Sequence, residues 1–403
     1  MLLLTGAALG DRFGRRRLFA AGISLFMASS IACALSGSIV ALIVARAAQG
    51  ASSALIMPLG MALLSAASPR EERARALGIF SGVIGVAVLA GPAIGGAITE
   101  GLGWQWIFWI NLPIGLIAII MVMTRLRESF GPAAAWLVLL AASAFALVWG
   151  LLRGNGAGWS SAEVLTAFVA GLLLAAAFVI LERLISAPMV PMRLFRSRAL
   201  SSGIIASFLL YAAMYGVLFL LPQFLQTALG YGPLGVGLRL LPWTATLFVT
   251  APIAGNVVNR IGERTLVVMG LSMQAIGLGW IAMIITPGVA YAAMVAPLVV
   301  AGVGVSMAMP AVQNAVLSSV NVVEMGKASG VFNMGRFLGG MFGVALLVAV
   351  FSGTGAVGSA AAFSGGFGAA MMIASALSLL GAIAGLWLPA RRRTVASEAA
   401  RTA

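Results

Sequence analysis

Residues 10–19 read GDRFGRRRLF, and this short stretch decides how the rest of the chain is interpreted. Asp11 and four arginines fall within residues 11–17, while the sequence on both sides is almost entirely apolar. Gly14 lies inside the cluster, and it allows a tight turn between two helix ends. The stretch therefore indicates a short charged loop between two membrane-spanning segments.

The composition places the chain in a lipid bilayer. Of its 403 residues 62% are hydrophobic and only 8% are charged, whereas soluble domains carry about 25% charged residues. A chain of this length cannot bury so much apolar surface within itself, so lipid must be its main solvent. It has no histidine and one cysteine, Cys33, which excludes an intramolecular disulfide and removes the commonest metal ligand. We expect no metal site and no cofactor.

Twelve apolar runs are long enough to cross a bilayer, which takes about 20 residues of helix. They lie at 18–37, 39–67, 76–98, 106–123, 134–152, 163–181, 200–221, 234–255, 265–285, 291–318, 328–352 and 364–389. None shows the period-two pattern of a barrel strand, so we predict helices. The segment MLLLTGAAL (1–9) is about half a span long and looks like the end of a helix whose beginning is missing. The sequence predicts an all-α integral membrane protein with about twelve full spans and a partial N-terminal one.

Basic residues lie on one side of the predicted spans, because every second connection is rich in arginine. The exceptions are Arg46, Arg153, Arg239 and Arg336. The positive-inside rule puts the basic side, with the C-terminal tail 391–403, in the cytoplasm. The net charge of +14 is therefore a topology signal, and we expect no nucleic-acid partner.

The chain contains an internal repeat. Residues 11–18 align with 259–266, keeping Arg, Gly, Arg and Leu in register, and Met57-Pro58 aligns with Met309-Pro310. Chance matching among glycine- and alanine-rich helices is the alternative explanation. A duplication of this kind predicts two pseudo-symmetric helix bundles with a site between them near the midplane.

These motifs resemble the major facilitator superfamily, and within it the fourteen-span drug:proton antiporters. GAALGDRFGRRRLF is similar to the family's cytoplasmic signature, RAAQGASSALIMPLGMALL to its fourth span, GPAIGGAI to its antiporter motif and WQWIFWINLPIGL to its sixth span. YGPLGVGLRLLPW and ASGVFNMGRFLGG are similar to its tenth and thirteenth spans. The resemblance implies a cytoplasmic gating motif of Gly6, Asp11, Arg12, Gly14, Arg15 and Arg16, and an antiporter motif of Gly91, Pro92, Gly95 and Gly96.

The resemblance also suggests a domain division. We expect an N-terminal half-bundle at 1–128, two extra spans and a cytoplasmic loop at 129–198, a C-terminal half-bundle at 199–390 and a tail at 391–403. The N-terminal half then lacks the family's first span, and its second is partial. The simplest hypothesis is an N-terminally truncated sequence.

Arg46 is the most informative single residue, because it lies inside an apolar run where a charge costs about 2.5–3.5 kcal/mol on insertion scales. Gln49, Gly50 and Ser53 follow on the same helical face. The resemblance implies a role for Arg46 in proton coupling, and the alternative is an arginine that only binds neighbouring carbonyls. Candidate pathway residues are Arg46, Gln49, Ser53, Tyr211, Tyr215, Gln313, Asn314, Asn333 and Arg336. The tyrosines could instead belong to the interfacial aromatic belt.

The acidic residues depart from the family pattern, since none of the ten lies deep in a span. This weakens both proton coupling and transport of multivalent cations. The sequence nevertheless favours a secondary transporter, a proton-coupled exporter of small organic molecules that works by alternating access. A truncated, non-transporting relic or sensor is the alternative, and a membrane enzyme lacks catalytic groups. We expect a monomer in the bacterial inner membrane, with lipid, protons and a small-molecule substrate as its partners.

Overall fold

The computed structural model describes residues 10, 13–67, 83, 87, 90–126, 128–130, 137–185, 192–320, 325–356 and 358–389. Within these residues the chain forms helices and no strand, as predicted. In the N-terminal part the helices are α2 (Arg15–Ala34), α3 (Ile39–Ala67), α5 (Trp106–Trp109) and α6 (Asn111–Arg125), and residues 90–101 are also helical. Two further helices follow, α7 (Leu137–Ala157) and α8 (Ala162–Leu184).

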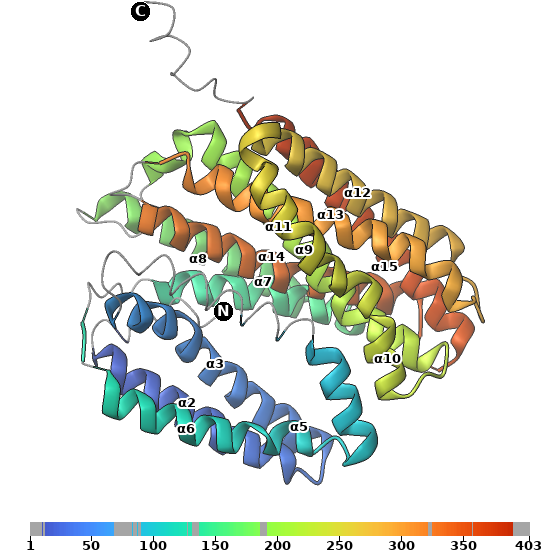
Figure 1. Ribbon diagram of the computed structural model, residues 1–403, viewed down its shortest axis with the longest axis horizontal. Coiled ribbons are helices and arrows are strands. Elements are labelled where there is room, and N and C mark those ends of the chain that lie inside the picture. The colour runs from blue at the N-terminus through green and yellow to red at the C-terminus, as the bar shows by residue number, and fades with distance from the viewer. Residues whose placement is uncertain are drawn as a thin grey trace, which may run out of the picture. The chain divides into compact units, whose positions relative to one another are not determined.

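The C-terminal part begins with a short 3-10 helix, η1 (Met192–Arg196), and α9 (Arg198–Thr227). It continues with α10 (Pro233–Arg239), α11 (Leu241–Ile261), α12 (Glu263–Ile284), α13 (Tyr291–Leu317), α14 (Met325–Thr354) and α15 (Ala360–Leu386). Figure 1 shows these helices with their labels.

Ten segments of the described residues are long and apolar enough to cross a membrane, and each coincides with a run predicted from the sequence. Of the remaining two runs, 134–152 overlaps α7, and 76–98 lies mainly outside the described residues. Large apolar side chains such as Ile117 and Leu173 lie on the helix surfaces. An exposed apolar surface of this kind is what lipid contact requires.

The helices form two compact units. The first comprises residues 1–150, 160–181 and 231–240, and the second comprises 151–159, 182–230 and 241–403. In the first unit α2 packs against α3 and α6; in the second α9 packs against α14 and α15, and α12 against α13 and α15 (Figure 1). The first unit includes α10, which the sequence division assigns to the C-terminal half. That division at 128, 198 and 390 stays a prediction.

Glycines set the close helix packing in the second unit. A Cβ atom on Gly339 or Gly343 would overlap the backbone of Phe208 or Ala212, and one on Gly340 would lie 2.6 Å from the ring of Tyr215. Small residues let two backbones approach where lipid supplies no hydrophobic drive to associate. They hold α14 directly against α9, and this fixes which side chains of the two helices meet.

The internal repeat reappears in the backbone. Gly14 precedes α2 with φ 101° and ψ 122°, and the aligned Gly262 precedes α12 with φ 93° and ψ 146°. Residues other than glycine rarely adopt this backbone conformation. The aligned prolines also occupy equivalent helices, because Pro58 lies in α3 and Pro310 in α13. The two bundles therefore share local geometry at the positions that the sequence repeat aligns.

Candidate transport and gating sites

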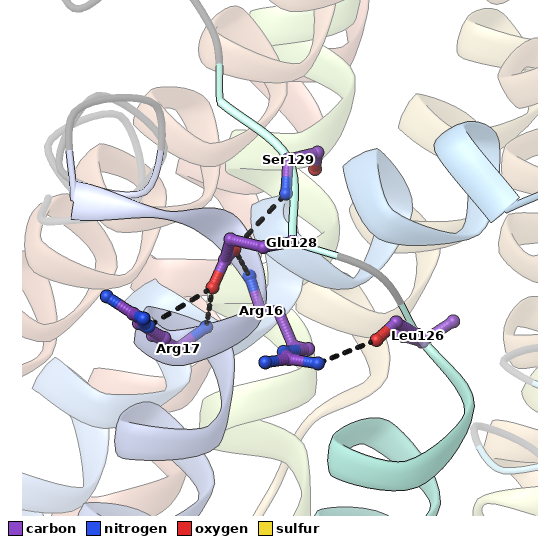
Figure 2. A network of polar contacts seen from close by, with 5 residues as sticks. All are labelled: Arg16, Arg17, Leu126, Glu128 and Ser129. Carbon is purple, nitrogen blue, oxygen red and sulfur yellow. Dashed lines mark hydrogen bonds and ion pairs between the residues drawn. The ribbon is translucent and has the colours of Figure 1, made fainter.

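The charged loop is held by an acid that the sequence analysis did not select. The Glu128 carboxylate accepts hydrogen bonds from the backbone N–H groups of Arg16 at 2.7 Å and Arg17 at 3.2 Å, and from that of Ser129 at 3.2 Å (Figure 2). The Arg16 side chain donates to the Leu126 carbonyl at 3.0 Å. Glu128 thus caps the start of α2 from the far end of α6, where a negative charge is favoured by the helix dipole.

Gly14 is required at this site for two reasons. Its φ of 101° is unfavourable for other residues, and a Cβ atom there would lie 2.8 Å from the carboxylate carbon of Glu128. The Arg15 backbone N–H donates to the Ser129 carbonyl at 2.9 Å, so the chain after α6 is bound to the start of α2 at several points. Gly6, Asp11 and Arg12, the other predicted members of the gating motif, lie outside the described residues.

Arg46 and Gln49 meet on α3, as their spacing predicts. The Arg46 guanidinium donates to Gln49 Oε1 at 2.6 Å, and its Cζ lies 5.7 Å from the centre of the Phe108 ring. Gln49 is buried and donates in turn to Ser30 Oγ at 2.6 Å, which also accepts from Asn111 at 3.3 Å. The predicted stripe on α3 is therefore part of a network that includes α2 and α6.

Ser53 is not bonded to this network by its side chain, since its hydroxyl donates to the Gln49 backbone carbonyl at 2.9 Å within α3. The additional members, Ser30 and Asn111, were not selected because single polar residues in apolar runs give no pattern on their own. Asn111 is the only polar side chain of α6 that precedes Thr124.

In the second unit, α9 and α14 bring three of the predicted residues together. The rings of Tyr211 and Tyr215 stack with centroids 6.0 Å apart, and Arg336 Cζ lies 4.8 Å from the Tyr211 centroid. The Tyr215 side chain also interacts with the Arg336 guanidinium. Tyr211 is only 3% exposed, so it packs inside the bundle instead of in an interfacial belt.

The other predicted residues of this half form separate hydrogen bonds or are exposed. Asn333 donates to the Ser329 carbonyl of its own helix, and Gln313 is exposed. Asn314 donates to the Glu263 carboxylate at 2.9 Å, near the last turn of α13 and the first turn of α12. The structure thus places Asn314 at a helix end, beside Glu263. Glu263 lies in one of the arginine-rich connections that the sequence assigns to the cytoplasmic side.

The GPAIGGAI segment packs against α10. A Cβ atom on Gly237 would overlap the Pro92 carbonyl, and one on Gly96 would lie 2.8 Å from the Leu234 Cα. One turn along, the Glu100 carboxylate accepts from the Leu234 backbone N–H at 3.1 Å. A Cβ atom on Gly91 or Gly95 would meet no described atom within 4 Å, so only part of the motif makes the contact.

Comparison with known proteins agrees with these features. The family model described as Major Facilitator Superfamily matches residues 1–344 and, in a second match, 204–403. The chain belongs to the major facilitator superfamily. Members of this superfamily are multi-pass membrane transporters and not enzymes, as the sequence predicts.

Two superfamily relatives show the extent of the likeness. The multidrug resistance protein Stp of Mycobacterium tuberculosis is 33% identical over 87% of this chain and 66% of its own length. The tetracenomycin C resistance and export protein of Streptomyces glaucescens is 34% identical over 86% of this chain and 65% of its own length. The chain therefore spans slightly less than two thirds of these relatives.

A solved structure confirms the superfamily fold. The crystal structure of a POT family transporter in complex with 5-aminolevulinic acid has a TM-score of 0.69 and 14% identity, over 95% of this chain and 83% of that one. Identity at this level shows the fold alone. The predicted all-α architecture of two pseudo-symmetric bundles is thus confirmed.

Proposed function

We propose that the protein is a secondary active transporter that exports small organic molecules, drugs included, in exchange for protons. The observation that carries this proposal is the close contact of the GPAIGGAI segment with α10. An exchanger must close one side of its pathway tightly, because a loose closure would let protons leak. The carbonyl of Pro92 lies against Gly237, which leaves no room for a side chain between the two backbones.

The names of the relatives support the substrate class and the direction. One is described as a multidrug resistance protein and another as a resistance and export protein. Carried over to this chain, these descriptions favour export of antibiotics or similar organic compounds. A bilayer location in the inner membrane of a bacterium, a monomeric state, a cytoplasmic C-terminus and the lack of a nucleic-acid partner are part of the same proposal.

Within this proposal, Arg46 has an indirect role in proton coupling. A guanidinium has N–H donors and no acceptor, so Arg46 offers no site at which a transported proton could bind. It would instead bind or repel the group that carries the proton. Its hydrogen bond to Gln49 and the contact with Phe108 hold it on one side of α3, ready for such a partner.

Dye export tests the function directly. We would express the chain in a bacterial host that lacks its own efflux pumps and follow the accumulation of ethidium and of carboxyfluorescein. Cells with the protein should accumulate less of at least one dye than cells with an empty vector, and an uncoupler should abolish the difference. The membrane content of the protein must be measured in parallel.

The possible results separate the functions. Equal accumulation of both dyes, with the protein present in the membrane, contradicts export and favours the non-transporting alternative. A difference that survives the uncoupler keeps transport and removes proton coupling.

A further inference from the structure

The second unit contains an intramembrane cation that has no acidic partner among the described residues. Arg336 lies in the transmembrane helix α14, and no described carboxylate forms an ion pair with it. Helix α14 packs against α9, α13 and α15, and none of these four helices contains Asp or Glu. A charge inside a membrane normally pairs with an opposite charge or faces a polar pathway. Its neighbours here are neutral.

The bonds of Arg336 leave capacity for a ligand. The Tyr215 side chain interacts with the guanidinium, and the Tyr211 and Phe337 rings contact it through their faces, with Cζ 4.8 Å and 5.6 Å from the centroids. A guanidinium has five N–H donors, and a ring face does not replace an oxygen acceptor for them. The Nε atom is buried with no hydrogen-bond partner among the described atoms. The side chain as a whole is partly exposed.

The surroundings of Arg336 are fixed by packing, and this favours a built site over a loose side chain. Gly339 and Gly340 press α14 onto α9 at Phe208 and Tyr215, one turn beyond Arg336. The Tyr211 ring lies against the guanidinium, and Tyr215 stacks on Tyr211. A cation and a hydroxyl beside the half-buried Tyr215 ring match an organic anion, whose carboxylate binds the guanidinium fork and whose apolar part lies on that ring.

We propose that Arg336, Tyr211 and Tyr215 form a binding subsite for organic anions, an aromatic carboxylate in the simplest case. The inference rests on the proposed transport function and narrows its substrate class. It agrees with Arg46, another arginine within a span, whose hydrogen-bond acceptor Gln49 is neutral. Cationic compounds would meet a repulsive charge at this subsite.

Three probes of the same shape test the charge preference. We would add 2-naphthoate, 2-naphthamide or 2-naphthylmethylammonium to the purified full chain in lipid nanodiscs and follow thermal unfolding by tryptophan fluorescence. The naphthoate should raise the unfolding midpoint in a saturable manner, and the amide and the ammonium should not. No stabilisation by 10 mM naphthoate, or equal stabilisation by the ammonium, would overturn the proposal.

Variants assign the effect to the subsite. Arg336→Gln should weaken naphthoate binding by about tenfold or more, the usual effect of losing a hydrogen bond to a charged group. Arg336→Lys should keep part of the affinity, and Tyr215→Phe should weaken binding less than Arg336→Gln does. Arg183→Gln, which removes an equal charge from an exposed position on α8, should leave binding unchanged.

Two further results are decisive. If Arg336→Gln does not fold, the comparison uses Tyr215→Phe, Tyr211→Phe and Arg336→Lys, and unchanged binding in all three overturns the subsite. Ethidium export without naphthoate binding would contradict this inference alone. Absence of all dye export would contradict the proposed function, whatever the binding result.

Discussion

At the scale of single residues, Glu128 and Gly14 form one unit although they are far apart in the sequence. The carboxylate occupies the position where a Gly14 side chain would begin, and it accepts the first N–H groups of α2. Either residue can therefore be understood only with the other. The aligned Gly262 has the same backbone conformation at the start of α12, where Glu263 is bound by Asn314. Both copies of the repeat have the glycine, but the nearby acid is Glu128 in the first copy and Glu263 in the second.

A double-mutant cycle tests this unit, with Gly158 as the control. Gly158 also has a positive φ, 89°, but a Cβ atom there meets no described atom within 4 Å. Gly158→Ala should therefore cost only backbone strain, about 1–2 kcal/mol. Gly14→Ala should cost that and also the cap at α2, about 0.5–2 kcal/mol. Unfolding midpoints of the purified variants in detergent give the comparison.

The Glu128→Ala background completes the cycle. There the Gly14→Ala change should lower the midpoint no more than Gly158→Ala does. If the two glycine changes are equally harmful in the native background, the carboxylate does not restrict position 14 and the proposed coupling is wrong.

At the scale of elements, neighbouring glycines of one motif have different environments. Gly96 lies against α10, whereas Gly95 faces no described atom within 4 Å. The sequence motif does not distinguish them, because both are glycines in an apolar helix. The position of α10 distinguishes them, because a Cβ atom on Gly96 would meet α10 and a Cβ atom on Gly95 would not.

The pair gives a matched test of the seal. Gly96→Ala should disturb the contact with Pro233 and Leu234 and allow proton leak, whereas Gly95→Ala should be tolerated and could gain up to about 1 kcal/mol of helix stability. Proton leak into proteoliposomes under an imposed potential is the measurement, with a pH-sensitive dye inside. Equal leak from the two variants, or none from either, would refute the sealing role of this contact.

At the scale of the whole molecule, the order of spans and the distribution of arginines predict one topology. The turn between α2 and α3 is expected outside, and the end of α8 is expected in the cytoplasm. The chain offers a convenient background for testing this, since its single cysteine, Cys33, is fully buried.

Cysteine labelling in intact cells checks the orientation. Gly37→Cys lies in the exposed turn before α3, and Arg183→Cys lies at the exposed end of α8. A membrane-impermeant maleimide should label the first from outside and label the second only after the cells are opened. The unaltered chain should remain unlabelled in both conditions. The reverse labelling pattern would show that the topology is inverted and that the charged loop at residues 10–19 is extracellular.

The sequence by itself determined the fold class, the helical spans and the family. Long apolar runs in lipid are stable as helices, and charged residues lie at their ends. It also placed Arg46 with Gln49 and identified Tyr211, Tyr215 and Arg336 as residues of interest, because helical spacing and the cost of burial act locally. Gly14 and Gly262, which both have positive φ, were already aligned by the repeat.

Only the tertiary structure decided which of these residues work together. Glu128 reaches α2 across more than a hundred residues, and Ser30 and Asn111 join Arg46 from two other helices. Asn314 pairs with Glu263 at a helix end, apart from the Arg336 cluster. The physical reason is that partners on different helices are selected by the axial and rotational position of each helix. In lipid, that position is set by close glycine contacts between helices, which a single sequence does not reveal.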